Sequence, residues 1–212
     1  MIVVNLARSY QQLVELETVG VEQDLLSITQ GEWPPLSESS LEGYADLLVG
    51  VFQDVIVTAY RIARVQVLLV DGVKKMVFQV EPPVDRDLNP VSLDSDAARE
   101  PAAWLIGCPI PGGPWKRGEA RGTRRWLLED YLDDHPDLAA RQSRRHSPQR
   151  AVQLLRYFQG KDVPDAQELF PALRPGTMAA PEPGVTVVRE PGGTVVITIP
   201  TGTRAQVNIE PN

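Results

Sequence analysis

The sequence predicts an α+β protein, in which a small β-barrel with flanking helices is followed by a helical segment and a three-stranded β-meander. Two pairs of apolar, β-branched runs in the first half are each joined by a turn-like dipeptide, which predicts hairpins in a mixed or antiparallel barrel. Three alternating runs near the C-terminus predict the meander. The 212 residues, 42% of them hydrophobic, suffice for one domain and an appendage.

The first two elements are predicted from short apolar stretches. Residues 2–6 predict a short strand. Residues 21–28 predict a short helix, because Val21, Leu25 and Ile28 fall on one helical face. Gly31 is expected to end this helix.

Four predicted strands then form the barrel. They are residues 45–52, 55–62, 65–70 and 75–80. The pairs Gln53-Asp54 and Asp71-Gly72 supply the two hairpin turns. Because residues 65–70 are continuously hydrophobic, we expect that strand to be covered on both faces.

The chain that leaves the barrel is predicted to be irregular at first. Residues 81–99 are rich in Pro, Asp and Ser and predict a long surface loop. Residues 104–106 predict a short strand, and residues 126–132, after a basic and glycine-rich segment, predict a helix.

The next segment is predicted to be helical. Ser147-Pro148 is typical of a helix start, and Gly160 of a helix end. Val152, Leu155 and Phe158 recur every three residues and are expected to form the buried stripe of this helix.

The C-terminal part predicts a separate small sheet. A short helix is expected over residues 165–173, and the composition of residues 176–184 is that of a linker. The three meander strands are residues 185–190, 194–199 and 204–209. The predicted domains are therefore a barrel at 1–135, a helical segment at 136–175, the linker, and the meander at 185–212.

The composition limits the location and the chemistry. The longest apolar stretch, residues 47–62, contains polar side chains and is too short to span a bilayer. The start of the chain lacks the pattern of a secretory signal, and Cys108 is the only cysteine, so no disulfide forms within the chain. We therefore expect a cytoplasmic protein with no membrane partner.

The charge of the chain is unevenly distributed. The net charge is −7, yet residues 101–160 carry ten Lys and Arg against six Asp and Glu. Residues 1–100 carry seven against sixteen. An acidic total weakens long-range attraction to nucleic acid, but a local basic face can still bind a polyanion. Seventeen of the 21 cations are Arg, which indicates either bidentate recognition or the codon bias of a GC-rich genome.

No catalytic or metal-binding pattern occurs in the sequence. His135 and His146 lie eleven residues apart without carboxylates or thiols at ligand spacing. Cys108 has no histidine nearby and is expected to be a small buried residue. A phosphate-binding loop, a dinucleotide fingerprint and a nucleophile elbow are all lacking from the sequence. We expect no enzymatic activity, no metal and no cofactor.

The order of motifs along residues 20–126 resembles that of a known family. It consists of the helix, Gly31-Glu32-Trp33, two core strands, an aromatic strand that ends at Glu81, and the basic turn Trp115-Lys116-Arg117-Gly118. Residues 20–126 resemble the bacterial PUA-like domains related to EVE and ASCH domains. The resemblance implies a small β-barrel of a group known or suspected to bind nucleic acid, whose members are often joined to restriction-type nucleases or found beside them.

The basic residues supply the candidate binding site. Residues 112–126 hold five cations and two tryptophans, and guanidinium groups bind phosphates while indole faces stack on bases. The candidate nucleic-acid-binding residues are Arg61, Arg64, Trp115, Lys116, Arg117, Arg121, Arg124 and Arg125. Residues that would extend the basic face, unless they form a solvated helix surface, are Arg141, Arg144, Arg145 and Arg150.

Several of these residues have a second interpretation. Arg61 and Arg64 would either contact phosphate or form exposed salt bridges. Trp33 is expected to be a core anchor where the helix meets the barrel, rather than a platform for a base.

Two hypotheses for the function remain open. The leading one is a non-enzymatic nucleic-acid-binding module, a reader of modified or flipped bases in a phage-defence or mobile-element setting. The alternative is an interaction or scaffold protein, in which residues 185–209 form an oligomer or bind a protein partner. A three-stranded sheet with one apolar face cannot bury that face alone, which favours the alternative.

Overall fold

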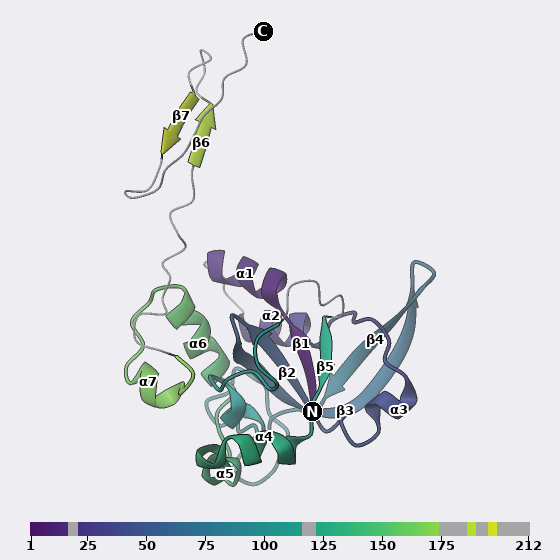
Figure 1. Cartoon of the computed structure of the whole chain (residues 1–212). Coiled ribbons are helices and arrows are strands. Elements are labelled where there is room, and N and C mark those ends of the chain that lie inside the picture. The colour runs from purple at the N-terminus through teal and green to yellow at the C-terminus, as the bar shows by residue number, and fades with distance from the viewer. Residues whose placement is uncertain (17–20, 116–121, 174–185, 190–194, 199–212) are drawn as a thin grey trace. The chain divides into compact units, whose positions relative to one another are not determined.

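The computed structural model describes residues 1–16, 21–115 and 122–173, and the backbone alone of residues 186–189 and 195–198. The chain forms two compact units, Met1–Arg174 and Pro175–Asn212. Figure 1 shows a curled, five-stranded half-barrel with surrounding helices in the first unit. The α+β class is therefore confirmed.

The sheet of the first unit is mixed. Its strands are β1 (Ile2–Asn5), β2 (Leu47–Phe52), β3 (Val55–Val70), β4 (Val73–Val80) and β5 (Thr123–Arg125). Their order is β4-β3-β2-β1-β5. The central strands β1 and β2 are parallel, whereas the other neighbouring pairs are antiparallel. The basic segment therefore returns to the sheet as the edge strand β5.

Strand β3 is responsible for much of the curl. Its first half pairs with β2 and its second half pairs with β4, with shifts in register at Gly50/Val51 and at Ile62/Arg64. Such bulges bend a strand and increase its twist. The prediction of two separate strands at 55–62 and 65–70 is wrong, because the residues between them form a bulge and not a turn.

Burial differs between the two halves of β3. All of β2 and the first six residues of β3 are buried, which fits strands covered on both faces. The predicted covering of residues 65–70 is wrong, since Val67 and Leu69 are 56% and 71% exposed. In Figure 1 the tip of the β3–β4 hairpin extends beyond the helices.

Seven α-helices and one 3₁₀ helix surround the sheet in the described part of the first unit. They are α1 (Ala7–Glu15), α2 (Val21–Gln30), α3 (Glu38–Leu41), η1 (Ala103–Leu105), α4 (Leu128–Asp134), α5 (Pro136–Gln142), α6 (Arg150–Phe158) and α7 (Ala166–Leu169). The helix at 21–28 is confirmed, whereas the strand expected at 104–106 is wrong because η1 occupies that position. Within the described residues, no helix combines the length and the apolarity needed to cross a membrane.

The core lies between the sheet and these helices. Helices α1, α2 and α6 contact one another, and α2 and α6 also contact β3. Tyr10, Phe52 and Phe158 join α1, β2 and α6 through ring contacts of 4.9–6.0 Å between centroids. The buried stripe expected on α6 is only partly correct: Leu155 is buried, but Val152 and Phe158 are half-buried.

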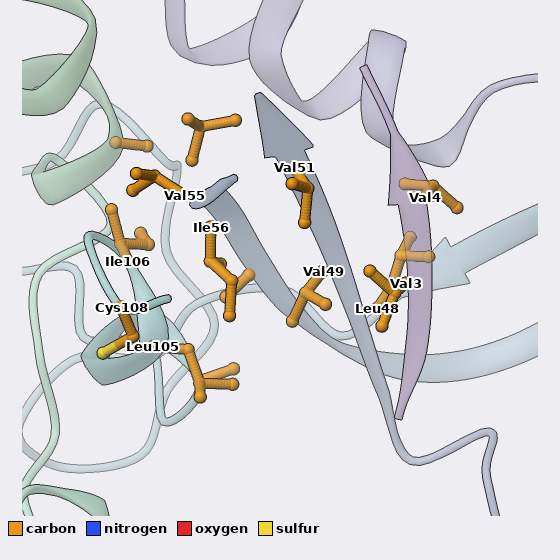
Figure 2. Close-up of a cluster of buried hydrophobic side chains, with 14 of the residues drawn as sticks. Val3, Val4, Leu48, Val49, Val51, Val55, Ile56, Leu105, Ile106 and Cys108 are labelled. Carbon is orange, nitrogen blue, oxygen red and sulfur yellow. The ribbon is translucent and has the colours of Figure 1, made fainter. Parts of the chain in front are cut away.

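The segment after η1 closes the other side of β3. Ile56 N donates to Cys108 O at 2.9 Å, and Gly107 N donates to Ile56 O at 2.7 Å. Figure 2 shows Leu105, Ile106 and Cys108 against the buried valines of the sheet. Cys108 is fully buried, as the sequence predicted.

The second unit contains an antiparallel pair, β6 (Thr186–Arg189) and β7 (Val195–Thr198). These strands match two of the three predicted at the C-terminus. The third predicted strand, residues 204–209, lies outside the described residues, as does the predicted linker.

Candidate nucleic-acid interface

The described candidate residues fall into two groups. Trp115, Arg124 and Arg125 lie on β5 or on the turn before it, whereas Arg61 and Arg64 lie on β3. Strands β1 and β2 separate these groups, and three inter-strand spacings of about 4.8 Å amount to about 14 Å. The structure therefore brings together only the residues around β5. Outside the described residues lie Lys116, Arg117 and Arg121.

Arg124 ties β5 to the preceding turn. Its guanidinium carbon lies 4.0 Å from the ring centroid of Trp115. Nη1 donates to Gly113 O at 2.7 Å, and Nη2 donates to Pro114 O at 3.1 Å. The charge thus lies on one face of the indole, and the half-buried Trp115 side chain also packs against the hydrophobic core. Arg124 therefore stabilises the turn.

Two indole N–H groups at this turn lack acceptors. The Nε1 atoms of Trp115 and Trp126 are buried and have no hydrogen-bond partner among the described residues. A buried donor without a partner costs about 1–3 kcal/mol. Because these atoms are buried, a phosphate or base oxygen supplies the missing acceptor only if the side chains that cover them move aside.

The position of Trp126 is fixed by its neighbours. Its backbone N donates to Met1 O at 3.0 Å, and Met1 N donates to its O at 2.6 Å. Gly112 has a φ of +73°, and a Cβ atom there would lie 2.5 Å from the Trp126 ring. The glycine is therefore required both by the backbone conformation and by the contact.

A second cation–aromatic pair lies on the other face of β5. The guanidinium carbon of Arg125 is 5.1 Å from the ring centroid of Tyr44. Successive strand residues point to opposite faces, so Arg124 and Arg125 present one pair on each side of the edge strand. Arg125 is exposed, which makes it the described β5 cation best placed for a ligand. Tyr44 was not predictable as a site residue, because only the fold brings it to this strand.

Trp33 anchors α2 and β4, as expected. Its Nε1 donates to Thr29 O at 2.9 Å, and its backbone pairs with Met76 through hydrogen bonds of 2.9 and 2.8 Å. A Cβ atom at Gly122 would lie 3.5 Å from the Trp33 ring, so this ring also underlies the return of the basic segment. Trp33 therefore has structural partners on three elements.

The arginines of β3 have little local stabilisation. Arg61 Nε lies 4.0 Å from the carboxylate of Glu81, and this is the one ion pair in the described part of the chain. Both side chains are about half exposed, at 53% and 48%, so the pair contributes little. Arg64 is exposed at the bulge.

Two of the helix arginines turn inward and do not extend the basic face. Arg141 Nη2 donates to Leu169 O at 3.2 Å, and Arg150 donates to the same oxygen. Arg150 is only 8% exposed and lies over the Phe170 ring. Burial lowers the pKa of Arg150 to about 10. A solvated surface is wrong for Arg150, because α7 and the residue after it cover it.

The remaining candidate residues lie between α5 and α6. Arg144 and Arg145 are exposed. His146 is half-buried, and its Nε2 lies 3.2 Å from Arg141 O. No group of three metal-ligating side chains occurs in the described ranges. Searches of protein-family models, curated proteins and solved structures found no match to this chain.

Proposed function

We propose that this protein is a non-enzymatic nucleic-acid-binding module with a PUA-like barrel, and that the edge strand β5 and its turn hold the ligand. The two unpaired indole N–H groups of Trp115 and Trp126 carry this proposal. Trp115 lies under the Arg124 guanidinium, and the sequence between Trp115 and β5 also contains Lys116, Arg117 and Arg121. Buried donors and cations together are complementary to the oxygens of a nucleic acid.

The roles within this site follow from the chemistry. The exposed Arg125 and the cations of the turn bind phosphates, and a face of the half-buried Trp115 ring stacks on a base. A base reaches this face only from a single strand or after it has been flipped out of a duplex. We therefore propose a single-stranded or flipped-base ligand, which agrees with a reader of modified bases.

Titration of labelled single- and double-stranded DNA and RNA at two salt concentrations tests the proposal. The single-stranded form is expected to bind more tightly, with an affinity that falls as salt rises. Replacing Lys116, Arg117 and Arg121 together by Ala should weaken binding and reduce the salt dependence. Arg156→Ala, on the exposed side of α6, is the matched control and should have no effect.

Trp115→Phe is a sharper variant. It keeps an aromatic ring beneath Arg124 and removes the indole N–H. A hydrogen bond to a charged acceptor contributes about 1.5–3 kcal/mol, so the affinity should fall at least roughly tenfold. Equal binding by wild type, Trp115→Phe and the triple variant, or no binding at low salt, would exclude the site.

The alternative function concerns the second unit. The described β6–β7 pair is a two-stranded hairpin, and a sheet of this size is at best marginally stable by itself. We propose that residues 185–209, with the predicted third strand, dock a second copy or a protein partner. Light scattering of the full chain and of a chain truncated at Gly184 tests this, since the same oligomeric state and partners for both would exclude it.

A further inference from the structure

A hollow of about 370 Å³ opens between the long loop after β4 and the connection from α5 to α6. Its volume falls within the range of about 300–1,000 Å³ that is typical of small-molecule sites. The lining residues are Asp85, Arg86, Leu88, Ala97, Arg99 and Arg145. Three arginines therefore line one cavity, two from the long loop and one from the α5–α6 connection, and none of them belongs to the β5 turn.

Backbone pairs hold the walls of the hollow in place. Val84 and Arg99 exchange two hydrogen bonds of 3.0 and 2.7 Å. Glu100 and His146 exchange another two of 2.7 and 3.3 Å, which fixes the segment next to Arg145. The long loop is thus fastened to itself and to the helical segment, and the arginines are positioned by an ordered frame.

The arginines of this hollow form no ion pair with a carboxylate among the described residues, although Arg145 lowers the pKa of the buried Glu100. Arg86 and Arg145 have neither an ion pair nor a hydrogen bond among the described residues. Arg99 uses Nη1 alone, to donate to Asp96 O at 3.0 Å and to Ala98 O at 2.6 Å. Most of the guanidinium donors that face the hollow therefore remain available.

Asp85, the one acid that lines the hollow, accepts hydrogen bonds from its own loop. One oxygen of Asp85 accepts from the backbone N of Asp87 at 2.8 Å and of Asn89 at 2.9 Å. These hydrogen bonds hold the pKa of Asp85 below its usual value. Asp85 thus shapes the loop, and one negative charge faces three positive ones.

Leu88 is unusual in both conformation and exposure. Its φ is +69°, a left-handed value that is uncommon for a bulky side chain, and it is 61% exposed. Backbone strain of this kind persists where the surroundings impose it, and it is concentrated at ligand sites. Here the loop places an apolar side chain at the wall of a cationic hollow, next to Ala97.

We propose that this hollow binds a small phosphomonoester. The phosphate is held by Arg86, Arg99 and Arg145, and the carbon part of the ligand rests on Leu88 and Ala97. Guanidinium forks match the oxygens of a phosphate and can bind them in pairs, which explains why three arginines are used. The site is separate from the β5 turn and does not depend on nucleic-acid binding there.

Calorimetric titration of the full chain tests this proposal. The probes are inorganic phosphate, AMP, adenosine and a 5′-phosphorylated oligonucleotide. AMP should bind, inorganic phosphate should bind more weakly, and adenosine should not bind. Binding of the oligonucleotide alone would assign the phosphate to a nucleic-acid end and would overturn the small-ligand proposal.

Single substitutions, each compared with a control variant, test which residues bind AMP. Arg86→Ala and Arg145→Ala should each weaken AMP roughly tenfold, as expected for loss of hydrogen bonds to a charged group. Arg8→Ala, an exposed position on α1, should leave the affinity unchanged. The triple Ala variant of the basic turn should also bind AMP normally, so this test and that of the β5 site can fail separately.

Leu88→Gly provides a second, independent readout. Glycine tolerates the positive φ, so the melting temperature of the protein should not fall. The affinity for AMP should fall while that for inorganic phosphate stays the same, because only the apolar wall is lost. Unchanged AMP affinity in Leu88→Gly together with unchanged affinity in both arginine variants would overturn the proposal, as would the absence of AMP binding to the wild type.

Discussion

Replacing Glu100 by Gln should change how the stability of the protein depends on pH. Glu100 is 1% exposed, and its Oε1 accepts a hydrogen bond from Ala102 N at 2.9 Å. The pKa of this carboxyl is raised from 4.5 to about 7, chiefly by burial and also by Glu81, against the opposing effects of the Ala102 hydrogen bond and of Arg61 and Arg145. Glutamine keeps an acceptor oxygen but carries no charge at any pH.

The sign of the effect follows from where the proton is held. The folded protein binds the Glu100 proton more tightly than the unfolded chain does, because the pKa is higher in the folded state. This contribution to stability is fully present below pH 4.5 and is lost as the pH rises to about 7. Each pKa unit corresponds to about 1.4 kcal/mol, so the whole change is on the order of 3 kcal/mol.

The assay is urea denaturation followed by circular dichroism at pH 5 and at pH 8. The advantage of Glu100→Gln over wild type should be small at pH 5 and should grow by on the order of 1–3 kcal/mol at pH 8. Glu129→Gln, at an exposed position on α4, is the control and should give the same difference at both pH values. A constant difference for Glu100→Gln, or a lower stability of this variant at pH 8, would refute the reasoning.

Three further predictions concern the core. Gly107→Ala should destabilise the fold by about 1–3 kcal/mol in thermal denaturation, because the φ of Gly107 is +82° and a Cβ atom would lie 2.5 Å from Phe170. A wild-type melting temperature for this variant would contradict the prediction. Arg150→Met should be neutral or stabilising by ~1 kcal/mol, because it removes a buried charge beside Arg141. A clear loss of stability in urea would show that the guanidinium is needed. Cys108 should react with a thiol reagent only when the protein unfolds, because it is fully buried and burial raises its pKa to about 11. Fast labelling of the folded protein at pH 8 would be inconsistent with this geometry.

The hairpin turns were predictable because their cause is local. Gln53 and Asp54 have φ values of 47° and 61°, and Asp71 and Gly72 have 50° and 77°. Two successive positive φ values belong to the tight turns that match the twist of antiparallel strands. Polar residues and glycine adopt them at low cost, so the strand pairs on either side could be located from the sequence alone.

The exposure of residues 65–70 was not predictable in the same way. An apolar run has the same sequence pattern whether helices cover the strand or not. Coverage depends on which distant elements contact the strand. Here α2 and α6 contact β3, and α2 also contacts β4, whereas the tip of the β3–β4 hairpin extends beyond the helices. The helix α1 was missed because its pattern mixes polar residues with only two buried ones, Tyr10 and Leu13.

In the candidate site, too, local features could be predicted from the sequence, whereas contacts between distant segments could not. The sequence located the basic turn and its tryptophans, because composition is enough to find a cluster of cations. It could not show that Arg124 serves the turn itself, nor that Tyr44 joins Arg125, since both depend on contacts between segments distant in the chain. Arg150 was placed on a surface because the covering residue Phe170 follows twenty positions later.

The balance of acids and arginines bears on how this protein could bind anions at all. The chain has 28 Asp and Glu against 21 Lys and Arg, yet the described part contains one ion pair. At physiological salt the Debye length is about 8 Å, so distant acids repel an anion only weakly once it reaches the surface. What then decides binding is the local count of unpaired guanidinium groups. Among the described residues, Arg86 and Arg145 in the hollow and Arg125 on β5, which lies over Tyr44, have no hydrogen bond or ion pair, whereas Arg141 and Arg150 donate to a backbone carbonyl. An acidic protein with unpaired surface arginines should therefore associate slowly with polyanions but select them at short range.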